Sequence, residues 1–350
     1  MRLSKTAFFT LASLAAMRCA SPLPASILLV ANKTDNTVDL IDLHRQESVA
    51  TLPTGHAPHE IAVSPDGKVA VVANYGDREK PGATLTVVDI GRAEVDGEID
   101  LGDHTRPHGL VFVGQERVAV TAEGSRHLLV VDLRDRQVAS AIDTGQEISH
   151  MVTATADGRR AFVANIGSGS VTAIDLRTGR KLADIPTGEG AEGIAVTPDG
   201  REVWVTNRGA DTLSVIDPET LEVVATVDCP GFPIRIAVTP DGQHALVSAA
   251  STGEVVVIDI QRRREVRRTQ LDLSTAPDAG SRLFGDRFGE SPVPVGLVVH
   301  PLGSLAWVAA TQADVVVAVD PADLTVRGLL TAGREPDGMA FSSAEPPSGD

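Results

Sequence analysis

Three histidines occupy the same position in three similar segments of the chain. The segments APHEIAV, RPHGLVF and ISHMVTA place His59, His108 and His150 at one register. The chain has only 9 histidines, so composition alone does not explain this alignment. Imidazole binds zinc, copper and iron, and three histidines with an open coordination position suit metal catalysis. The pattern predicts either a divalent metal held by these three residues or a plain turn that starts a strand.

The same register recurs in four later segments and adds charged side chains. AEGIAV, FPIRIAV, PVGLVV and PDGMAF align Glu192, Ile234, Val295 and Asp337 with the histidines, and Arg235 follows Ile234. If the two ends of the chain meet, the polar members form one arc: Asp337, His59, His108, His150, Glu192 and Arg235. We expect this arc to bind a small polar ligand or a protein partner. The sequence shows no complete acid–base pair, nucleophile motif or closed metal motif, so we assign no catalytic residue.

A repeat must position these residues. An apolar-x-apolar-Asp phrase ends at Asp42, Asp89, Asp132, Asp175, Asp217, Asp259 and Asp320, mostly 42 to 47 residues apart, with a last interval of 61. One unit contains four short β-branched stretches at 193–196, 202–207, 212–217 and 222–228, separated by Gly, Pro and Asp. A unit of this length with four strands is typical of a β-propeller blade. We expect the repeated aspartates to cap turns.

The two ends of the repeat are complementary. The chain starts at a second strand, 26–32, and ends at a first strand, 338–342. We therefore predict an all-β, seven-bladed propeller of four-stranded antiparallel blades over residues 26–342, in which the C-terminal strand completes the first blade. An open solenoid is the alternative, but solenoids need capping repeats. The polar residues 343–350 are expected to form a disordered tail.

The repeats VANKTDNTVDLID, VANIGSGSVTAID and VTNRGADTLSVID resemble the YVTN-repeat seven-bladed β-propeller family, which includes YncE-like exported propellers. The resemblance covers roughly residues 27–341 and departs where Ala249 and Ala250 replace the usual Asn. The resemblance implies the fold. It does not imply a function, because members of the family share little chemistry. Propellers of similar appearance include lactonases and lyases with a metal at the channel mouth, so an alternative function is a metal-dependent lactonase- or lyase-like enzyme that uses the channel-mouth histidines. A redox accessory protein holding a haem or quinone is a further alternative, although the absence of Cys-x-x-Cys-His excludes covalent c-type haem.

The first 25 residues have the pattern of an export signal. Arg2 and Lys5 precede an apolar core at Ala7–Met17, and small residues lead to a cleavage point after Ala25. Arg18 fits a lipoprotein signal poorly, so lipidation of Cys19 is a minor alternative. No later stretch has 18 uninterrupted apolar residues, and the formal net charge of −16 disfavours nucleic acid as a partner. We expect a periplasmic or secreted monomer without a transmembrane segment.

Two segments are longer than the repeat requires. One is GDREKPGA at 76–83, and the other lies at 275–292 and contains Arg282 and Arg287. Long loops on a rigid scaffold commonly carry function. We expect the second to cover the polar arc and to add Arg282 and Arg287 to the ligand site, a variable surface insertion being the alternative.

Cys229 is expected to be a buried thiol, and Arg262–Arg264 to lie on a charged outer strand. The function that we predict is a non-catalytic binding platform.

Overall fold

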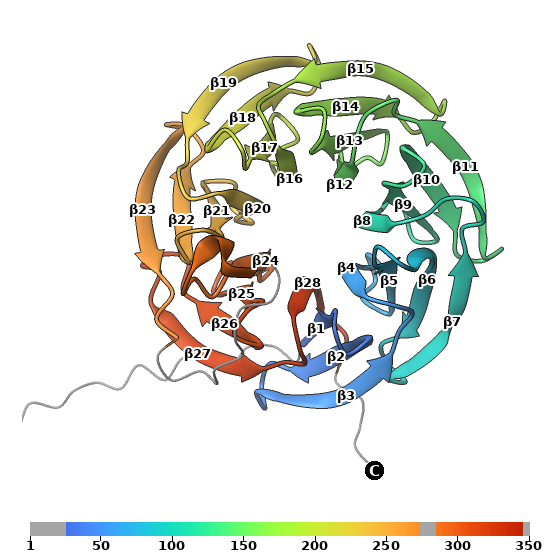
Figure 1. Cartoon of the computed structure of the whole chain (residues 1–350), viewed down its shortest axis with the longest axis horizontal. Coiled ribbons are helices and arrows are strands. Elements are labelled where there is room, and N and C mark those ends of the chain that lie inside the picture. The colour runs from blue at the N-terminus through green and yellow to red at the C-terminus, as the bar shows by residue number, and fades with distance from the viewer. Residues whose placement is uncertain (1–25, 274–284, 346–350) are drawn as a thin grey trace, which may run out of the picture.

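The computed structural model of the protein describes residues 26–273 and 285–345. Seven four-stranded antiparallel sheets surround a central channel, as Figure 1 shows. Each sheet is one blade, and we number the blades 1 to 7 from the one that contains β1. The predicted seven-bladed propeller is confirmed. The predicted export signal at 1–25, Arg282 in the second insertion and the end of the tail at 346–350 lie outside the described residues.

The innermost strand of every blade lines the channel. These strands are β28 (Pro336–Ser342), β4 (Pro58–Val63), β8 (Pro107–Phe112), β12 (Ser149–Ala154), β16 (Ala191–Val196), β20 (Pro233–Val238) and β24 (Pro294–Val299). The second strands are β1 (Ile27–Asn32), β5 (Val69–Gly76), β9 (Arg117–Ala122), β13 (Arg160–Asn165), β17 (Val203–Asn207), β21 (His244–Ala249) and β25 (Ala306–Ala310).

The outer half of each blade completes the sheet. The third strands are β2 (Thr37–Asp42), β6 (Pro81–Asp89), β10 (His127–Asp132), β14 (Ser170–Asp175), β18 (Thr212–Asp217), β22 (Glu254–Asp259) and β26 (Val315–Val319). The outermost strands are β3 (Glu47–Pro53), β7 (Glu94–Asp100), β11 (Gln137–Asp143), β15 (Arg180–Pro186), β19 (Glu222–Asp228), β23 (Arg264–Gln270) and β27 (Val326–Thr331). One short 3-10 helix, η1 (Gly285–Phe288), precedes β24.

The ring is closed by the last strand. β28 pairs antiparallel with β1, with Leu28 opposite Phe341 and Leu29 opposite Ala340. Figure 1 shows the red end of the chain beside its blue beginning. This pairing satisfies the backbone of both terminal strands and leaves no open edge inside the ring. The predicted closure by the C-terminal strand is confirmed.

Short polar turns end the strands where the repeat predicts them. In blade 5, Thr197 Oγ1 donates to Asp199 Oδ1 at 2.7 Å, and the next residue, Gly200, has φ +71°. Asp217 Oδ1 accepts from the backbone N–H groups of Glu219 at 2.8 Å and Thr220 at 3.0 Å. These side chains replace hydrogen bonds that the turning backbone cannot make. The repeated aspartates are therefore turn caps, as predicted.

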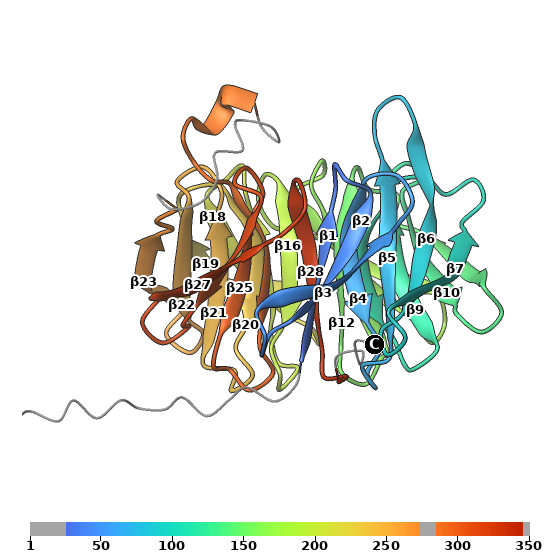
Figure 2. The same ribbon diagram turned by 90° about the horizontal axis from the view of Figure 1, so that it is seen from below.

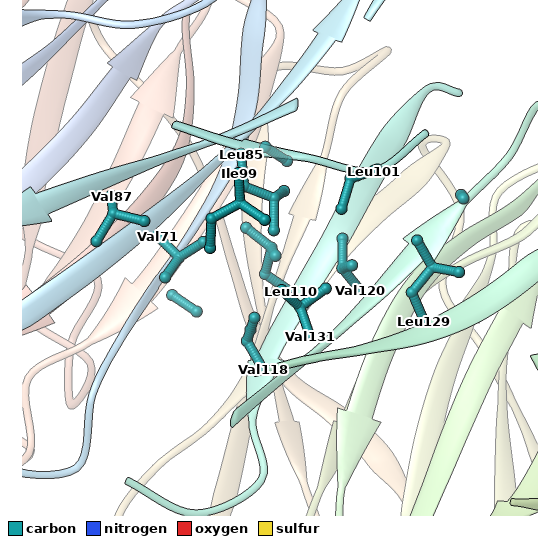
Figure 3. Close-up of a cluster of buried hydrophobic side chains, with 13 residues drawn as sticks. Val71, Leu85, Val87, Ile99, Leu101, Leu110, Val118, Val120, Leu129 and Val131 are labelled. Atoms are coloured by element: carbon teal, nitrogen blue, oxygen red, sulfur yellow. The ribbon is translucent and has the colours of Figure 1, made fainter. Parts of the chain in front are cut away.

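The apolar core lies between neighbouring blades. Figure 3 shows Val71, Leu85 and Ile99 of blade 2 packed with Leu110 and Val120 of blade 3. Burial of one such side chain contributes roughly 1.5–3 kcal/mol. Because every blade packs on both neighbours, the innermost strands are fixed relative to one another.

Glycines let the innermost strands approach closely. A Cβ on Gly296 of β24 would lie 1.9 Å from the backbone oxygen of Asp337, and one on Gly338 would lie 2.3 Å from that of His59. Such distances are far below van der Waals contact, so only Gly fits at these two positions. The close approach brings the residues that start each innermost strand to one end of the channel.

The two insertions project from the same face of the disc. Figure 2 shows the β5–β6 hairpin and η1 rising on the side where the innermost strands begin, which we call the top face. The first insertion, residues 76–83, is mostly strand rather than loop. The β5–β6 ladder continues into it, and Gly76 pairs with Pro81. Asp77 Oδ1 accepts from the N–H groups of Glu79 at 2.8 Å and Lys80 at 2.7 Å, which closes a tight turn.

Candidate functional site

The top end of the channel gathers the predicted polar arc. His59, His108, His150, Glu192 and Asp337 are each the second residue of an innermost strand. The ring centroids of His59 and His108 are 5.2 Å apart, and those of His108 and His150 are 3.7 Å apart. His150 Nε2 lies 3.3 Å from Glu192 Oε1. The structure thus places these side chains in one contact network, which we call the mouth cluster together with the partners named below.

Arg235 belongs to the mouth cluster but comes from the third position of its strand. Its guanidinium bonds Glu60 of β4 through Nε at 3.2 Å and through Nη2. Arg235 Nη1 also lies 3.4 Å from Glu192 Oε1. Both carboxylates are buried, and they raise the pKa of Arg235 further against the opposing effect of burial. Glu60 was not predicted as a site residue, although it occupies the same third position as Arg235.

Asp337 is a buried carboxyl beside the Arg235–Glu60 pair. Burial raises its pKa to about 6, Arg235 opposes this effect, and the Glu60 carboxylate adds to it. Asp337 Oδ1 has no hydrogen-bond partner among the described residues. The arc therefore contains a carboxyl that shifts between neutral and charged forms near neutral pH.

His150 is held between two carboxylates. Its Nδ1 bonds Glu123 Oε1, and its Nε2 faces Glu192. Burial lowers the pKa of His150, but the charges and hydrogen bonds of Glu123 and Glu192 outweigh burial and raise it to about 9. The imidazole is therefore a cation at neutral pH.

Glu192 is the acidic partner of three cations. Burial raises its pKa, but the bond to His150 and the nearby guanidiniums of Arg208 and Arg235 lower it to about 2. Arg208 Nη1 lies 2.7 Å from Glu192 Oε2. Glu192 is therefore charged, and it links the histidine half of the arc to Arg235.

His59 and His108 are neutral imidazoles. Burial lowers the pKa of each well below 6.5, with Lys33 and His150 as further causes. His59 Nδ1 donates to the backbone oxygen of Ala57 at 2.9 Å, because a carbonyl can only accept. His108 Nδ1 is buried and has no hydrogen-bond partner in the described part of the chain.

Tyr75 connects the first two histidines to Glu123. Its hydroxyl donates to Glu123 Oε2 at 2.7 Å, and its ring lies 4.3 Å from that of His59 and 5.5 Å from that of His108. Burial and the Glu123 carboxylate raise the pKa of Tyr75 to about 12. The phenol therefore remains a hydrogen-bond donor at neutral pH.

The sequence contains a signal for the missed partners. The residue that directly follows Asn32, Asn74, Ala122, Asn165 or Asn207 in the second strands of blades 1 to 5 is Lys33, Tyr75, Glu123, Ile166 or Arg208. Tyr75, Glu123 and Arg208 all contact the predicted arc. Aligning this second register would have predicted them.

The predicted set of three histidines and the structural donor group differ by one residue. One ring nitrogen each from His108 and His150 and one oxygen of Glu123 lie within 4.8 Å of one another. His59 is not a member of this group; its Nδ1 already donates to Ala57. Glu123 therefore takes the place that the sequence pattern suggested for His59.

The described part of the second insertion covers a different sector. Phe288 of η1 and Phe232 pack against Ile234 and Val295, the two apolar members of the aligned ring. The guanidinium carbon of Arg287 lies 4.8 Å from the centre of the Phe232 ring and 5.2 Å from that of Phe288. Arg287 thus borders the apolar sector of the opening, next to the polar arc.

The basic run lies on the edge of blade 6. Arg262 pairs with Asp259 at 2.6 Å, Arg263 with Glu202 at 2.7 Å, and Arg268 with Glu254 at 2.8 Å. This pairing satisfies much of the positive charge within the protein. Cys229 is fully buried, and burial raises the pKa of its thiol to about 12.

Comparison with known proteins agrees with this architecture. Residues 114–281 match the family described as YNCE-like beta-propeller. Over these residues the chain is similar to the YNCE-like β-propellers. The predicted family resemblance is confirmed. No curated protein is significantly similar to the chain.

Solved structures with the same fold span almost the whole chain. A functionally unknown protein from Desulfotomaculum acetoxidans DSM 771 has 13% identity and a TM-score of 0.74, covering 90% of this chain and 98% of that one. Kuenenia stuttgartiensis hydrazine synthase has 18% identity and a TM-score of 0.70, covering 88% and 99%.

A third similar structure is that of the dihydro-heme d1 dehydrogenase NirN in complex with DHE. It has 18% identity and a TM-score of 0.64, covering 94% of this chain and 78% of that chain. At these identities the likeness shows the fold alone. Among the described residues, no helix is long and apolar enough to cross a membrane.

Proposed function

We propose that the protein is an exported, monomeric binding platform that holds a small polar ligand at the top end of its channel. The ligand site is the mouth cluster. Its rigid frame comes from the innermost strands, which pack on one another around the ring. The proposed role is non-catalytic: binding and presentation of the ligand.

One observation carries this proposal. His59, His108, Glu60, Glu192, Arg235 and Asp337 are all buried at one end of the channel. Burial of charged groups is unfavourable unless they are paired, so a set of this size gathered at one end of the channel supports a binding role. His108 Nδ1 and Asp337 Oδ1 have no hydrogen-bond partner within the described residues, so the cluster has polar capacity left for a ligand.

The surroundings of the cluster suit a ligand site. The β5–β6 hairpin and η1 rise from the same face of the disc, as Figure 2 shows. Phe232 and Phe288 provide an apolar wall beside the charged arc. Ligand sites commonly combine such a wall with a few fixed polar groups.

The test uses three defined probes: zinc chloride, citrate and haem. Each is added to the protein purified without an affinity tag, and the melting temperature is compared with that of the Arg208→Gln and Arg159→Gln variants. Arg208 contacts Glu192 in the mouth cluster, whereas Arg159 lies in an exposed turn at the opposite face. We expect at least one probe to raise the melting temperature in a way that Arg208→Gln changes and Arg159→Gln does not. Equal responses of all three proteins, or none, would contradict the proposal.

Export is tested separately from binding. Residues 1–25 carry the signal pattern, so protein recovered from the periplasm or the medium should begin at Ser26. Intact-mass analysis of the fractionated protein gives the position of the cut. Full-length protein confined to the cytoplasm would contradict export and leave the binding test unaffected.

A further inference from the structure

We propose that His108, Glu123 and His150 form a site for a divalent transition-metal ion, with zinc and copper(II) as the matching ions. The inference rests on the proposed function, because it names the ligand that the mouth cluster takes. It goes beyond the sequence pattern in replacing His59 with Glu123.

The donor atoms lie close together before any ion is present. One nitrogen of each imidazole and one carboxylate oxygen are within 4.8 Å of one another. A tetrahedral site with bonds of 2.0–2.2 Å needs ligand atoms roughly 3.4 Å apart. Small rotations of three side chains therefore close the site without a change in the backbone. Two nitrogens and one oxygen form a donor set that suits zinc and copper(II).

The two imidazoles lie against each other, and one of them has an unpaired nitrogen. The ring centroids of His108 and His150 are 3.7 Å apart, with 35° between the ring planes. His108 Nδ1 is buried and has no hydrogen-bond partner within the part of the chain that the structure describes. A buried polar atom without a hydrogen-bond partner is unfavourable. An ion bound by His108 would remove this cost, either by taking Nδ1 as its ligand or by fixing the ring so that Nδ1 can donate.

A hydrogen bond already joins two of the proposed ligands. His150 Nδ1 donates to Glu123 Oε1. An ion bound by both groups takes the position of the donated proton, which leaves to solvent. The bound ion has two positive charges where the proton had one, and the neighbouring Glu192 carboxylate favours that increase.

The partners of the three ligands are also in place. The second oxygen of Glu123 accepts from the Tyr75 hydroxyl at 2.7 Å, and His150 Nε2 lies 3.3 Å from Glu192 Oε1. A histidine that binds a metal through one nitrogen commonly donates the other N–H to a carboxylate, which fixes the ring. Three protein ligands leave a fourth position for water or for a small polar molecule at the top face.

Neighbouring strands bring the set together. His108 and His150 are the second residues of the adjacent strands β8 and β12, and Glu123 directly follows β9 in the same blade as His108. Inter-blade packing fixes this spacing, so the site needs no folding of a separate loop.

The test is a calorimetric titration of the chelator-treated, tag-free protein with zinc chloride. We expect one ion per chain. Glu123→Gln, which keeps an acceptor for Tyr75, and His108→Gln should each weaken zinc binding by more than the roughly 10–100-fold that loss of a hydrogen-bond partner of a metal ligand costs. The matched control is His104→Gln in the same blade, since His104 and His127 form a half-buried imidazole pair with ring centroids 4.9 Å apart. His104→Gln should bind zinc like the unmodified protein.

Copper(II) gives a readout that does not depend on any variant folding correctly. The electron paramagnetic resonance spectrum of the unmodified protein with one equivalent of copper(II) should show coupling to two imidazole nitrogens. A copper(II) spectrum without nitrogen coupling would overturn the proposed metal site. So would zinc binding that is lost in His104→Gln and unchanged in Glu123→Gln. If neither metal binds but citrate or haem stabilises the protein through the mouth cluster, the metal inference fails and the platform stands. If no probe binds, both fail.

Discussion

Arg235 of β20 bonds Glu60 of β4 across the central channel. The two residues are 175 positions apart in sequence, and both are buried. Figure 1 shows that β20 and β4 lie on opposite sides of the central opening. The pair therefore joins blades 6 and 2 directly, in addition to the contacts that pass around the ring through neighbouring blades.

Removal of Arg235 should destabilise the whole propeller. Arg235→Met leaves Glu60 and Glu192 buried without one of their cations, and breaking a buried pair by removing one partner costs about 3–5 kcal/mol. The free energy of unfolding from urea denaturation measures this loss. Arg92→Met is the control, because Arg92 pairs with Asp89 on an exposed turn, and its unfolding midpoint should stay almost unchanged.

A double variant separates the ion pair from the packing of the arginine. Glu60→Gln added to Arg235→Met removes the unpaired carboxylate, so the double variant should be more stable than the sum of the single losses predicts, by about 0.5–3 kcal/mol. Strict additivity would show that the cross-channel pair does not couple the two residues.

The sequence predicts the frame of this site better than its centre. Turn residues such as Asp217 and the spacing of the repeats place every innermost strand, and so they place His59, His108 and His150. The Arg235–Glu60 contact depends on the width of the channel and on the reach of two long side chains, and no local pattern encodes either. Glu123 is intermediate, because its register is visible but its turn toward His150 follows from the packing of blades 3 and 4.

Gly296 should tolerate no side chain. A Cβ there would lie 1.9 Å from the backbone oxygen of Asp337, so Gly296→Ala must push β24 away from β28. We expect a loss of about 3 kcal/mol in the free energy of unfolding, the upper range for an overpacked site. Gly328→Ala in β27 is the matched control, since its Cβ would meet nothing within 4 Å. Equal stability of the two variants would contradict the close approach of these blades.

The thiol of Cys229 should be unreactive while the protein is folded. Cys229 has no exposed surface, and burial raises its pKa to about 12, so very little thiolate forms at pH 8. Protein that begins at Ser26 should show almost no reaction with an aromatic disulfide reagent until denaturant is added, and then one thiol per chain. Rapid reaction in the absence of denaturant would show that the region around β19 opens.

The charge of Asp337 should make stability depend on pH. Its folded pKa, about 6, lies above the ordinary value of 3.8 because burial disfavours the carboxylate. The folded state therefore binds the proton more tightly, and the stability that this contributes is fully present below pH 4 and is lost as the pH rises through 6. Asp337→Asn has no carboxyl at this position, so its stability should not fall in this way as the pH rises. The unfolding free energy of the variant minus that of the unmodified protein should rise by about 2 kcal/mol between pH 4 and pH 7.

Asp66 is the control for this pH dependence, because folding shifts its pKa in the opposite direction from that of Asp337. Ser64 Oγ donates to Asp66 at 2.7 Å and lowers the pKa of that carboxyl. Its contribution to stability is present above the unfolded pKa and is lost as the pH falls through the lower folded pKa, so the same difference for Asp66→Asn should not rise, and should fall only slightly, between pH 4 and pH 7. Urea denaturation at four pH values gives both curves. A difference for Asp337→Asn that is flat, or that follows the Asp66→Asn curve, would show that the Asp337 carboxyl is charged throughout this range and that the Arg235 guanidinium outweighs its burial.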